Sequence, residues 1–445
     1  MNKIKWKKIM HYMDHTIEFD DNKCIKCTKC VMRCKNCSVN YLEIKVDEEG
    51  KKHLSARDGA KCINCGQCTL VCPVNAIRSQ ENLNGIREIL KDKSKVLIVQ
   101  SAPSVRASIG EGWKMEHTLG IEKKMNTAFR KLGFNKVFDV NFGADITTMV
   151  EAQELIERLN NPKAKLPMFT SCCYAWVKYV LNYHPELKDN LTTARSPHLH
   201  SAGAYKTWWA EKEGIDPKNI VVVSIMPCTS KKEEILSEHA KINGMRLVDY
   251  SLTVRETIQL MKENNIDLPT LEDSEADTLG SYSGAGVIYG ASGGVMESAL
   301  RTAYKMITGE NLKDFNLTEV RTDTTGFKTA EIDIKGKKIK VAVVSTVQNV
   351  EKILAELKEN PNAYQYVEVM SCAGGCIGGG GMPLLPIRPA DQLALIEERR
   401  KVLYDIDSKK KVRTAHDNPL VKEYMEWVNS KNDSHLEHEL YHTEF

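Results

Sequence analysis

The sequence contains no run of 18 apolar residues, no surplus of one charge and no recognisable export signal. Without an apolar run of that length, no membrane span is expected. The 62 basic and 59 acidic residues nearly cancel, so the chain has no long-range field that would attract nucleic acid or an anionic membrane. The N-terminal residues carry lysines, but His11, Asp14 and His15 interrupt them before an apolar signal core could form. These absences together predict a cytoplasmic protein.

Cysteine, in contrast, is abundant and unevenly distributed. Nine of the 14 cysteines lie between Cys24 and Cys72. The other five are Cys172, Cys173, Cys228, Cys372 and Cys376. A cysteine-dense chain without an export signal is expected to bind metal rather than to form disulfides.

Residues 1–93 contain two copies of one cysteine pattern, Cys-x2-Cys-x2-Cys-x3-Cys. The pattern resembles that of bacterial two-cluster ferredoxins, in which the fourth cysteine of each run binds the other cluster. The ligands expected for one 4Fe-4S cluster are Cys24, Cys27, Cys30 and Cys72. Those expected for the other are Cys62, Cys65, Cys68 and Cys34. We therefore predict a small α+β ferredoxin-like domain that transfers electrons at low potential.

Two features leave alternatives open in this domain. A pair of structural zinc sites is one, although such sites usually pair two cysteines with two more after a gap. Lys35 stands where the first copy would carry a proline, and Cys37 belongs to neither run. Cys37 is expected to be a bystander thiol, with replacement of Cys34 as a cluster ligand as the alternative.

Residues 94–385 are expected to form an α/β body. Continuous β-branched runs suit strands that are buried on both faces. Such runs occupy residues 95–100, 136–140, 220–225 and 340–347, and a further strand-like run occupies 364–369. Helical periodicity fills residues 122–132, ending at Gly133, and residues 146–159, ending before Pro162. The alternation predicts mainly parallel sheets with flanking helices.

The five remaining cysteines all follow predicted strands. The pair at 172 and 173 follows Pro167 to Thr170, Cys228 follows the run at 220–225, and Cys372 follows the run at 364–369. Ligands of open α/β sheets gather beyond the carboxyl ends of the strands. The glycines from Gly378 to Gly381 would let the backbone close around a metal centre. We therefore expect five thiols in one pocket, one more than a cubane needs.

Three long segments carry a resemblance to FeFe-hydrogenases. They are TSCCYAW (170–176), MPCTSKKEE (226–234) and EVMSCAGGCIGGGGMP (368–383), in the order found in that family. The resemblance extends to residues 102–106, 142–154 and 282–301. It implies that the 4Fe-4S part of an H-cluster is held by Cys173, Cys228, Cys372 and Cys376, with Cys376 bridging to a two-iron subcluster that carries carbon monoxide, cyanide and a bridging dithiolate.

The resemblance also implies roles for residues around the cluster. Cys172 would be the proton carrier, because an unligated thiol can still gain and lose a proton. Lys231 and Ser104 would hydrogen-bond the cyanides, and Met226 and Met370 would form soft apolar walls. The implied proton path from the surface to Cys172 comprises Glu234, Glu151, Glu154 and Thr192. Taken alone, these glutamates would more simply be solvated helix positions and the methionines core residues.

Several positions depart from the family pattern. Tyr174 stands where proline is usual, His198 where glutamine is common, Tyr289 where phenylalanine is common, and Met382 where glutamine precedes the last proline. His198 and Tyr289 would line the two-iron pocket and alter its hydrogen bonding. None of the departures removes a ligand or Cys172.

Residues 386–445 resemble the small subunit of the same family, fused here as a tail that wraps the body. His435, His438 and His442 have metal-like spacing, but a packing helix is expected instead because no cysteine or carboxylate cluster accompanies them.

The resemblance implies a hydrogenase that interconverts two protons and two electrons with H2. The expected partners are an external ferredoxin or a similar low-potential carrier and the maturation proteins that build the two-iron subcluster. One alternative is a slow hydrogen-sensing protein with the same cluster, which the altered pocket residues favour. The other is a non-catalytic iron-sulfur protein resembling the eukaryotic hydrogenase-like assembly factors.

Overall fold

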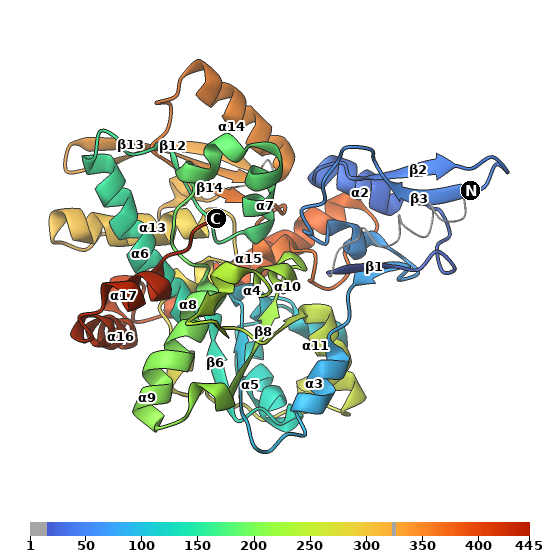
Figure 1. Cartoon of the computed structure of the whole chain (residues 1–445), viewed down its shortest axis with the longest axis horizontal. Coiled ribbons are helices and arrows are strands. Elements are labelled where there is room, and N and C mark those ends of the chain that lie inside the picture. The colour runs from blue at the N-terminus through green and yellow to red at the C-terminus, as the bar shows by residue number, and fades with distance from the viewer. Residues whose placement is uncertain (1–15, 323–325) are drawn as a thin grey trace.

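The computed structural model describes residues 16–322 and 326–445, and Figure 1 shows their arrangement. A small N-terminal lobe stands to one side of a larger body, which holds one sheet above and another below in this view. No helix among the described residues has the length and apolarity needed to cross a membrane.

From residue 16 onward, the N-terminal lobe contains two short antiparallel strand pairs and helix α2 (Lys29–Cys37). β1 (Ile17–Phe19) pairs with β4 (Ile77–Ser79), and β2 (Leu42–Val46) pairs with β3 (Lys52–Ala56). Helix α2 (Lys29–Cys37) carries the end of the first cysteine run, and a 3-10 turn at Gln67–Val71 carries part of the second. The lobe thus has the small α+β character expected of it.

The lower sheet of the body is entirely parallel, in the order β11-β8-β5-β6. Its strands are β5 (Val96–Ser101), β6 (Lys136–Asp139), β8 (Ile220–Met226) and β11 (Tyr250–Thr253). Buried side chains from both faces of this sheet join two large apolar clusters, as expected for strands that helices cover on both sides. The helices between these strands include α4 (Pro103–Arg106), α5 (Ile121–Leu132), α8 (Pro197–Ala204), α9 (Ala210–Glu213), α10 (Ser230–Glu234) and α11 (Val254–Glu263).

The upper sheet has the order β12-β13-β14-β7. β12 (Phe327–Ile334) and β13 (Lys337–Ser345) form an antiparallel hairpin, whereas β14 (Tyr366–Met370) and β7 (Met168–Phe169) continue the sheet in parallel. The neighbouring helices are α7 (Tyr174–Tyr183), α12 (Gly284–Ile288), α13 (Gly294–Thr308) and α14 (Val347–Glu359). The remaining elements are α3 (Leu83–Ile89) and the two-residue strands β9 (Lys241–Ile242) and β10 (Met245–Arg246). The mainly parallel α/β class is confirmed, with the strands divided between two sheets.

Helix α6 (Val140–Asn160) links the two sheets. It leaves the end of β6 and leads toward β7, and nearly all of its residues from Val140 to Leu155 are buried. The helix starts six residues earlier than residue 146, where periodicity placed it, because Asp139 caps it by accepting a hydrogen bond from Asn141 N. An apolar periodicity cannot mark this start, since the first turns are buried on every side.

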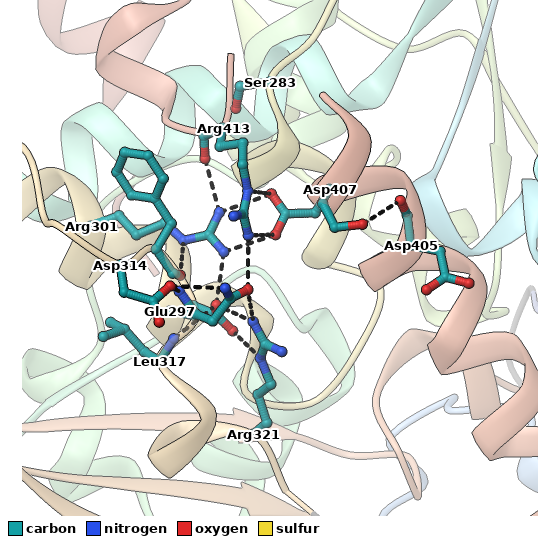
Figure 2. Close-up of polar contacts among 12 residues, drawn as sticks. Ser283, Glu297, Arg301, Asp314, Leu317, Arg321, Asp405, Asp407 and Arg413 are labelled. Atoms are coloured by element: carbon teal, nitrogen blue, oxygen red, sulfur yellow. Dashed lines mark hydrogen bonds and ion pairs between the residues drawn. The ribbon is translucent and has the colours of Figure 1, made fainter. Parts of the chain in front are cut away.

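The C-terminal tail packs along the body as three helices, α15 (Pro389–Lys409), α16 (Pro419–Ser430) and α17 (Ser434–Tyr441). A buried network of charges holds it against α13 (Figure 2). Arg301 donates to both Glu297 and Asp407, and Asp407 also accepts from Arg413. Buried carboxylates and guanidinium groups in this network satisfy one another, so removal of one partner would leave an uncompensated charge.

Candidate metal centre

Two cysteine-lined cavities occupy the N-terminal lobe. The outer cavity is lined by Cys24, Cys27, Cys30 and Cys72. The inner cavity is lined by Cys34, Cys62, Cys65 and Cys68. Each cavity therefore receives three thiols of one run and the fourth thiol of the other run. This crossed grouping is the geometry that two cubanes with exchanged fourth ligands would require.

Cys37 lies at the C-terminal end of α2 and lines neither cavity. It lies instead beside a surface groove bounded by α2 and the segment from Leu385 to Pro389. Cys34 lies in the inner cavity, where Tyr41 N donates to its sulfur at 3.1 Å. The bystander interpretation of Cys37 suits this placement better than the replacement of Cys34.

The two sheets of the body direct their strand ends at one central cavity. β7 leads into Cys172 and Cys173, and β14 leads into Cys372 and Cys376. β8 approaches from the lower sheet and leads into Cys228. All five thiols line the cavity. The pocket is thus enclosed between two sheets, rather than at the edge of one.

The glycine-rich loop after β14 closes the cavity toward the N-terminal lobe. Gly374 and Gly375 have φ values of 74° and 92°, a conformation that side chains rarely adopt. A Cβ atom on Gly380 would lie 2.2 Å from the carbonyl oxygen of Cys65, so only glycine allows this close backbone approach. Cys65 consequently lines both the inner lobe cavity and the central cavity.

A buried charged triad stands at one wall of the central cavity. Lys231 Nζ donates to Glu234 Oε2 and to the carbonyl oxygen of Cys172, the latter at 3.0 Å. His198 Nε2 lies 2.8 Å from the same Glu234 oxygen. Burial alone would raise the pKa of Glu234, but Lys231 and His198 lower it well below its ordinary value. Glu234 is therefore ionised, and its charge raises the pKa of Lys231 against the effect of burial.

Several buried polar atoms near this wall have no hydrogen-bond partner among residues 16–322 and 326–445. They are Ser104 Oγ, His198 Nδ1 and Glu151 Oε2. Buried polar groups in folded proteins are normally satisfied. His198 lines the cavity itself, and Ser104 follows the lining residue Pro103. The unsatisfied atoms and the clustered thiols fit a polar, metal-containing group in this cavity.

Met226, Met370 and Tyr289 also line the cavity. The Tyr289 hydroxyl lies 2.8 Å from Thr148 Oγ1, so its polar atom points to helix α6 and its ring faces the pocket. The two methionines are almost fully buried and give the cavity apolar walls. The predicted cofactor-binding residues are thus brought together, apart from Ser104, which lies one residue beyond the lining.

A line of carboxylates on α6 runs from the cavity toward the surface. Glu151 is fully buried, and its Oε1 accepts a hydrogen bond from the Tyr366 hydroxyl at 2.6 Å. Burial raises the pKa of Glu151 from its ordinary 4.5 to about 8, so this carboxyl is neutral near pH 7. Burial also raises the pKa of the Cys172 thiol well above its ordinary value, and Glu151 in its ionised form would raise it further.

The outer carboxylate, Glu154, lies nearly buried in a dense set of donors. Its Oε2 accepts from Thr192 Oγ1 at 2.6 Å and from Thr193 Oγ1 at 3.1 Å, and its Oε1 accepts from Arg158 at 2.6 Å. Two members of the expected path, Glu154 and Thr192, are therefore in direct contact. Within the described residues, no direct hydrogen bond joins Thr192 to Glu151.

Tyr366, Arg158 and Thr193 contact these carboxylates but were not anticipated as site residues. The spacing of Glu154 and Arg158, four residues apart on a helix, was the one available signal. Tyr366 lies in a strand that suggested only burial, and Thr193 meets Glu154 through tertiary packing. The predicted proton path is thus accompanied by partners that only the fold brings to it.

The fold and these cavities define an iron-sulfur protein with a central metal pocket. The profile described as "Iron only hydrogenase large subunit, C-terminal domain" matches residues 95–380. A 4Fe-4S dicluster profile matches residues 17–79, and the "Iron hydrogenase small subunit" profile matches residues 393–445. The chain therefore belongs to the FeFe-hydrogenase family and carries an N-terminal 4Fe-4S dicluster domain.

Relatives of this chain include both enzymes and assembly proteins. It is 40% identical over 437 residues to iron hydrogenase 1 of Clostridium pasteurianum, covering 97% of this chain and 76% of that protein. The solved apo [FeFe]-hydrogenase of Chlamydomonas reinhardtii is 33% identical, with a TM-score of 0.70 over 81% of this chain and 98% of that one. Cytosolic iron-sulfur assembly component 3 of Pongo abelii is 28% identical, covering 82% of this chain and 77% of that protein.

Proposed function

We propose that this protein is a catalytic FeFe-hydrogenase that interconverts two protons and two electrons with H2. The observation that carries the proposal is the fifth thiol: Cys172 lines the central cavity with the other four cysteines and lies close to the buried Glu151. A site that only stores electrons needs four ligands, whereas a site that handles protons also needs a free acid-base group.

In the proposal, Cys173, Cys228, Cys372 and Cys376 would hold the 4Fe-4S part of an H-cluster, and Cys376 would also help to hold its two-iron part. When bound, this cluster would supply the iron site at which protons and electrons combine. Lys231 and Ser104 would donate hydrogen bonds to its anionic ligands, because buried cationic and hydroxyl donors stabilise negative charge. Met226 and Met370 would keep water away from it.

The proton path in the proposal uses the carboxylates of α6. Glu154 would receive protons near the surface, Thr192 Oγ1 would pass them inward, and Glu151 would hold a proton at its carboxyl group before transfer to Cys172. The pKa of Glu151, about 8, suits this role because a relay works best when its pKa lies near the working pH. Glu234 would fix Lys231 and His198 in place rather than carry protons.

Electrons would follow the cavities of the N-terminal lobe. An external ferredoxin or a similar low-potential carrier would deliver them near Cys27, which is exposed and lines the outer cavity. Two 4Fe-4S clusters, one in each lobe cavity, would relay them to the central site past Cys65. Maturation proteins would be needed to install the two-iron subcluster. A cytoplasmic location remains part of the proposal.

The test is hydrogen evolution with a chemical reductant, on anaerobically matured protein whose infrared spectrum is recorded in the same sample. Carbonyl and cyanide bands with rapid turnover are expected. If these bands are absent after the same maturation treatment, the result would instead support a non-catalytic iron-sulfur assembly protein, like the assembly component among the relatives.

A hydrogen-sensing role is the second candidate function. The observation that favours it is the position of His198 at the wall of the central cavity. An imidazole bonded to Glu234 places a polar atom at the cavity, where it would change hydrogen bonding around the cluster. Carbonyl and cyanide bands with very slow turnover would support this candidate over the enzyme.

A further inference from the structure

The C-terminal tail reaches the outer end of the α6 carboxylate line. His442 follows helix α17, and its backbone pairs with Ala194 in an isolated bridge. Thr443 N donates to the carbonyl oxygen of Thr193 at 2.7 Å, and Arg195 N donates to the carbonyl oxygen of Tyr441 at 3.0 Å. The tail is therefore attached by backbone hydrogen bonds to the segment that contacts Glu154.

A continuous set of side-chain contacts joins this tail to Glu154. Thr193 Oγ1 donates to Glu154 Oε2 at 3.1 Å, and it lies 2.8 Å from His442 Nδ1. Since the threonine proton is directed at the carboxylate, His442 carries its own proton on Nδ1 and donates it to Thr193. The three groups thus form a directed row of hydrogen bonds that ends at Glu154.

A second histidine of the tail lies next to His442. His438 precedes it by one helical turn, and their ring centroids lie 5.5 Å apart. His438 is exposed and His442 is half-buried. The row of contacts therefore runs from the exposed His438 through His442 and Thr193 to a nearly buried carboxylate.

We propose that His442, with His438 beside it, collects protons from solvent and passes them through Thr193 to Glu154. This inference rests on the proposed function, because it assigns an entrance to the same proton path. A proton taken up at His442 Nε2 forms the imidazolium, the Nδ1 proton passes to Thr193 Oγ1, and the Thr193 proton passes to Glu154 Oε2. Rotation of the imidazole then exposes Nδ1 to solvent, where it takes up the next proton, and rotation back returns the Nδ1–H group to Thr193.

The charges around His442 come from three helices. Glu154 and Glu157 on α6 and Glu437 on α17 favour the imidazolium, whereas His438 on α17 opposes it. His200 on α8 also lies close enough to interact with it. Burial is the largest influence and lowers the pKa of His442 below its ordinary value, so the group gives up its proton readily near pH 7.

The third histidine of the tail lies outside this set of contacts. His435 lies on α17 as well, but its side chain is 78% exposed and its nearest charged group is Glu439 at 3.9 Å. It has no contact with Thr193 or Glu154 among the described residues. His435 is therefore a matched control for substitutions at the other two positions.

The first experiment compares His442→Gln, His438→Gln and His435→Gln in the full matured protein. Glutamine keeps a hydrogen-bond donor for Thr193 but cannot carry a proton. We expect His442→Gln to lower kcat about tenfold, to remove one titration step from the pH profile and to be partly rescued by added imidazole. His438→Gln should have a smaller effect in the same direction, and His435→Gln none. An unchanged kcat and pH profile in His442→Gln would overturn the proposal.

A second measurement separates this inference from the proposed function. The pKa of His442 is followed by NMR of isotope-labelled protein without the two-iron subcluster, in the wild type and in Glu154→Gln. Loss of the carboxylate charge should lower the pKa of His442, while that of His435 stays unchanged. No change at His442 would contradict the coupling of the two groups. A wild type that makes no H2 would reject the proposed function instead, and the NMR result would still decide the contact.

Discussion

The two cavities of the N-terminal lobe and the central cavity of the body are all lined by cysteines. Acid-base groups surround the central cavity and not the lobe cavities, as far as the described residues show. No carboxylate or histidine is among the described residues that line the two lobe cavities. His198, Lys231 and a fifth thiol line the central cavity, with Glu234 and Glu151 directly behind. The difference separates two tasks: a relay of electrons needs ligands alone, whereas chemistry on protons needs groups that titrate.

The two regions meet through close backbone packing and through side-chain hydrogen bonds. The central loop approaches the carbonyl oxygen of Cys65 so closely that Gly380 cannot carry a Cβ atom. Thr229 Oγ1 donates to the carbonyl oxygen of Asn64 at 2.6 Å nearby. Such rigid contacts suit electron transfer, because they hold the cavities at fixed separations.

The largest expected effect in this comparison comes from the fifth thiol. Cys172→Ser should lower hydrogen evolution by about 1,000-fold, because a serine hydroxyl is too weak an acid to replace the thiol in proton transfer. The carbonyl and cyanide bands should remain, since Cys172 is not a proposed ligand. Cys37→Ser, at a thiol outside all three cysteine cavities, is the control and should leave the rate unchanged. Loss of the infrared bands in Cys172→Ser would indicate that this thiol binds the cluster.

Glu151→Gln should lower hydrogen evolution by about 100-fold, because the amide keeps the shape of the side chain but cannot carry a proton. The measurement is the rate with a chemical reductant, so that electron delivery by the lobe does not limit it. Gln153→Glu, at an exposed position on α6, adds a carboxylate outside the path and should change little. A rate close to that of the wild type in Glu151→Gln would show that protons take another route.

Glu151 should also make the stability of the fold depend on pH. Its pKa rises from 4.5 in the unfolded chain to about 8 in the folded protein, so between these values the folded state holds a proton that the unfolded state has lost. The contribution of Glu151 to the free energy of unfolding therefore falls as pH rises through this window, by up to about 1.4 kcal/mol per pH unit. Urea unfolding of the wild type and Glu151→Gln at pH 5 and pH 8 should show the wild type losing more stability. Parallel losses would contradict the raised pKa.

A substitution in the lobe should change electron supply and leave proton chemistry intact. Cys68→Ala should remove about four irons per chain and slow hydrogen evolution driven by a protein carrier. The infrared bands of the central site should persist. Disappearance of those bands would mean that the lobe is needed to build the central site, and would weaken the division of tasks.

The smallest expected effect is at His198. His198→Gln removes an imidazole but keeps a polar group that can bond to Glu234, so the rate should change by no more than about tenfold. The carbonyl and cyanide bands should shift, because the polar group at the cavity wall changes. Unshifted bands would show that His198 does not act on the cluster. A large gain in rate would instead support a sensing role for the natural residue.

Local sequence patterns were sufficient for much of this molecule. The repeated cysteine spacing, with the resemblance to two-cluster ferredoxins, predicted the crossed grouping of thiols in the lobe, because in those proteins the fourth cysteine of each run binds the other cluster. The apolar runs at 95–100 and 220–225 correspond to strands β5 and β8. The placement of thiols after strands also agreed with the structure, since it depends only on the order of elements along the chain.

Several short strands, one helix start and the long-range contacts could not be predicted from local sequence patterns. Strands β7 and β11 are only two and four residues long, too short to give a periodic signal. The early start of α6 depends on a cap and on burial from every side. Tyr366 reaches Glu151 from a position 215 residues away, and a contact between such distant segments depends on packing.

The identity of the thiols, their spacing and the family of the chain follow from the amino-acid sequence, because ligand chemistry depends on residue type and local order. The meeting of the five body thiols between two sheets, and the position of Cys65 at two cavities, follow from the folded arrangement. The same holds for the contact of a tail histidine with Glu154 through Thr193. These outcomes depend on the packing of separate elements against one another, and no segment of the chain contains that information alone.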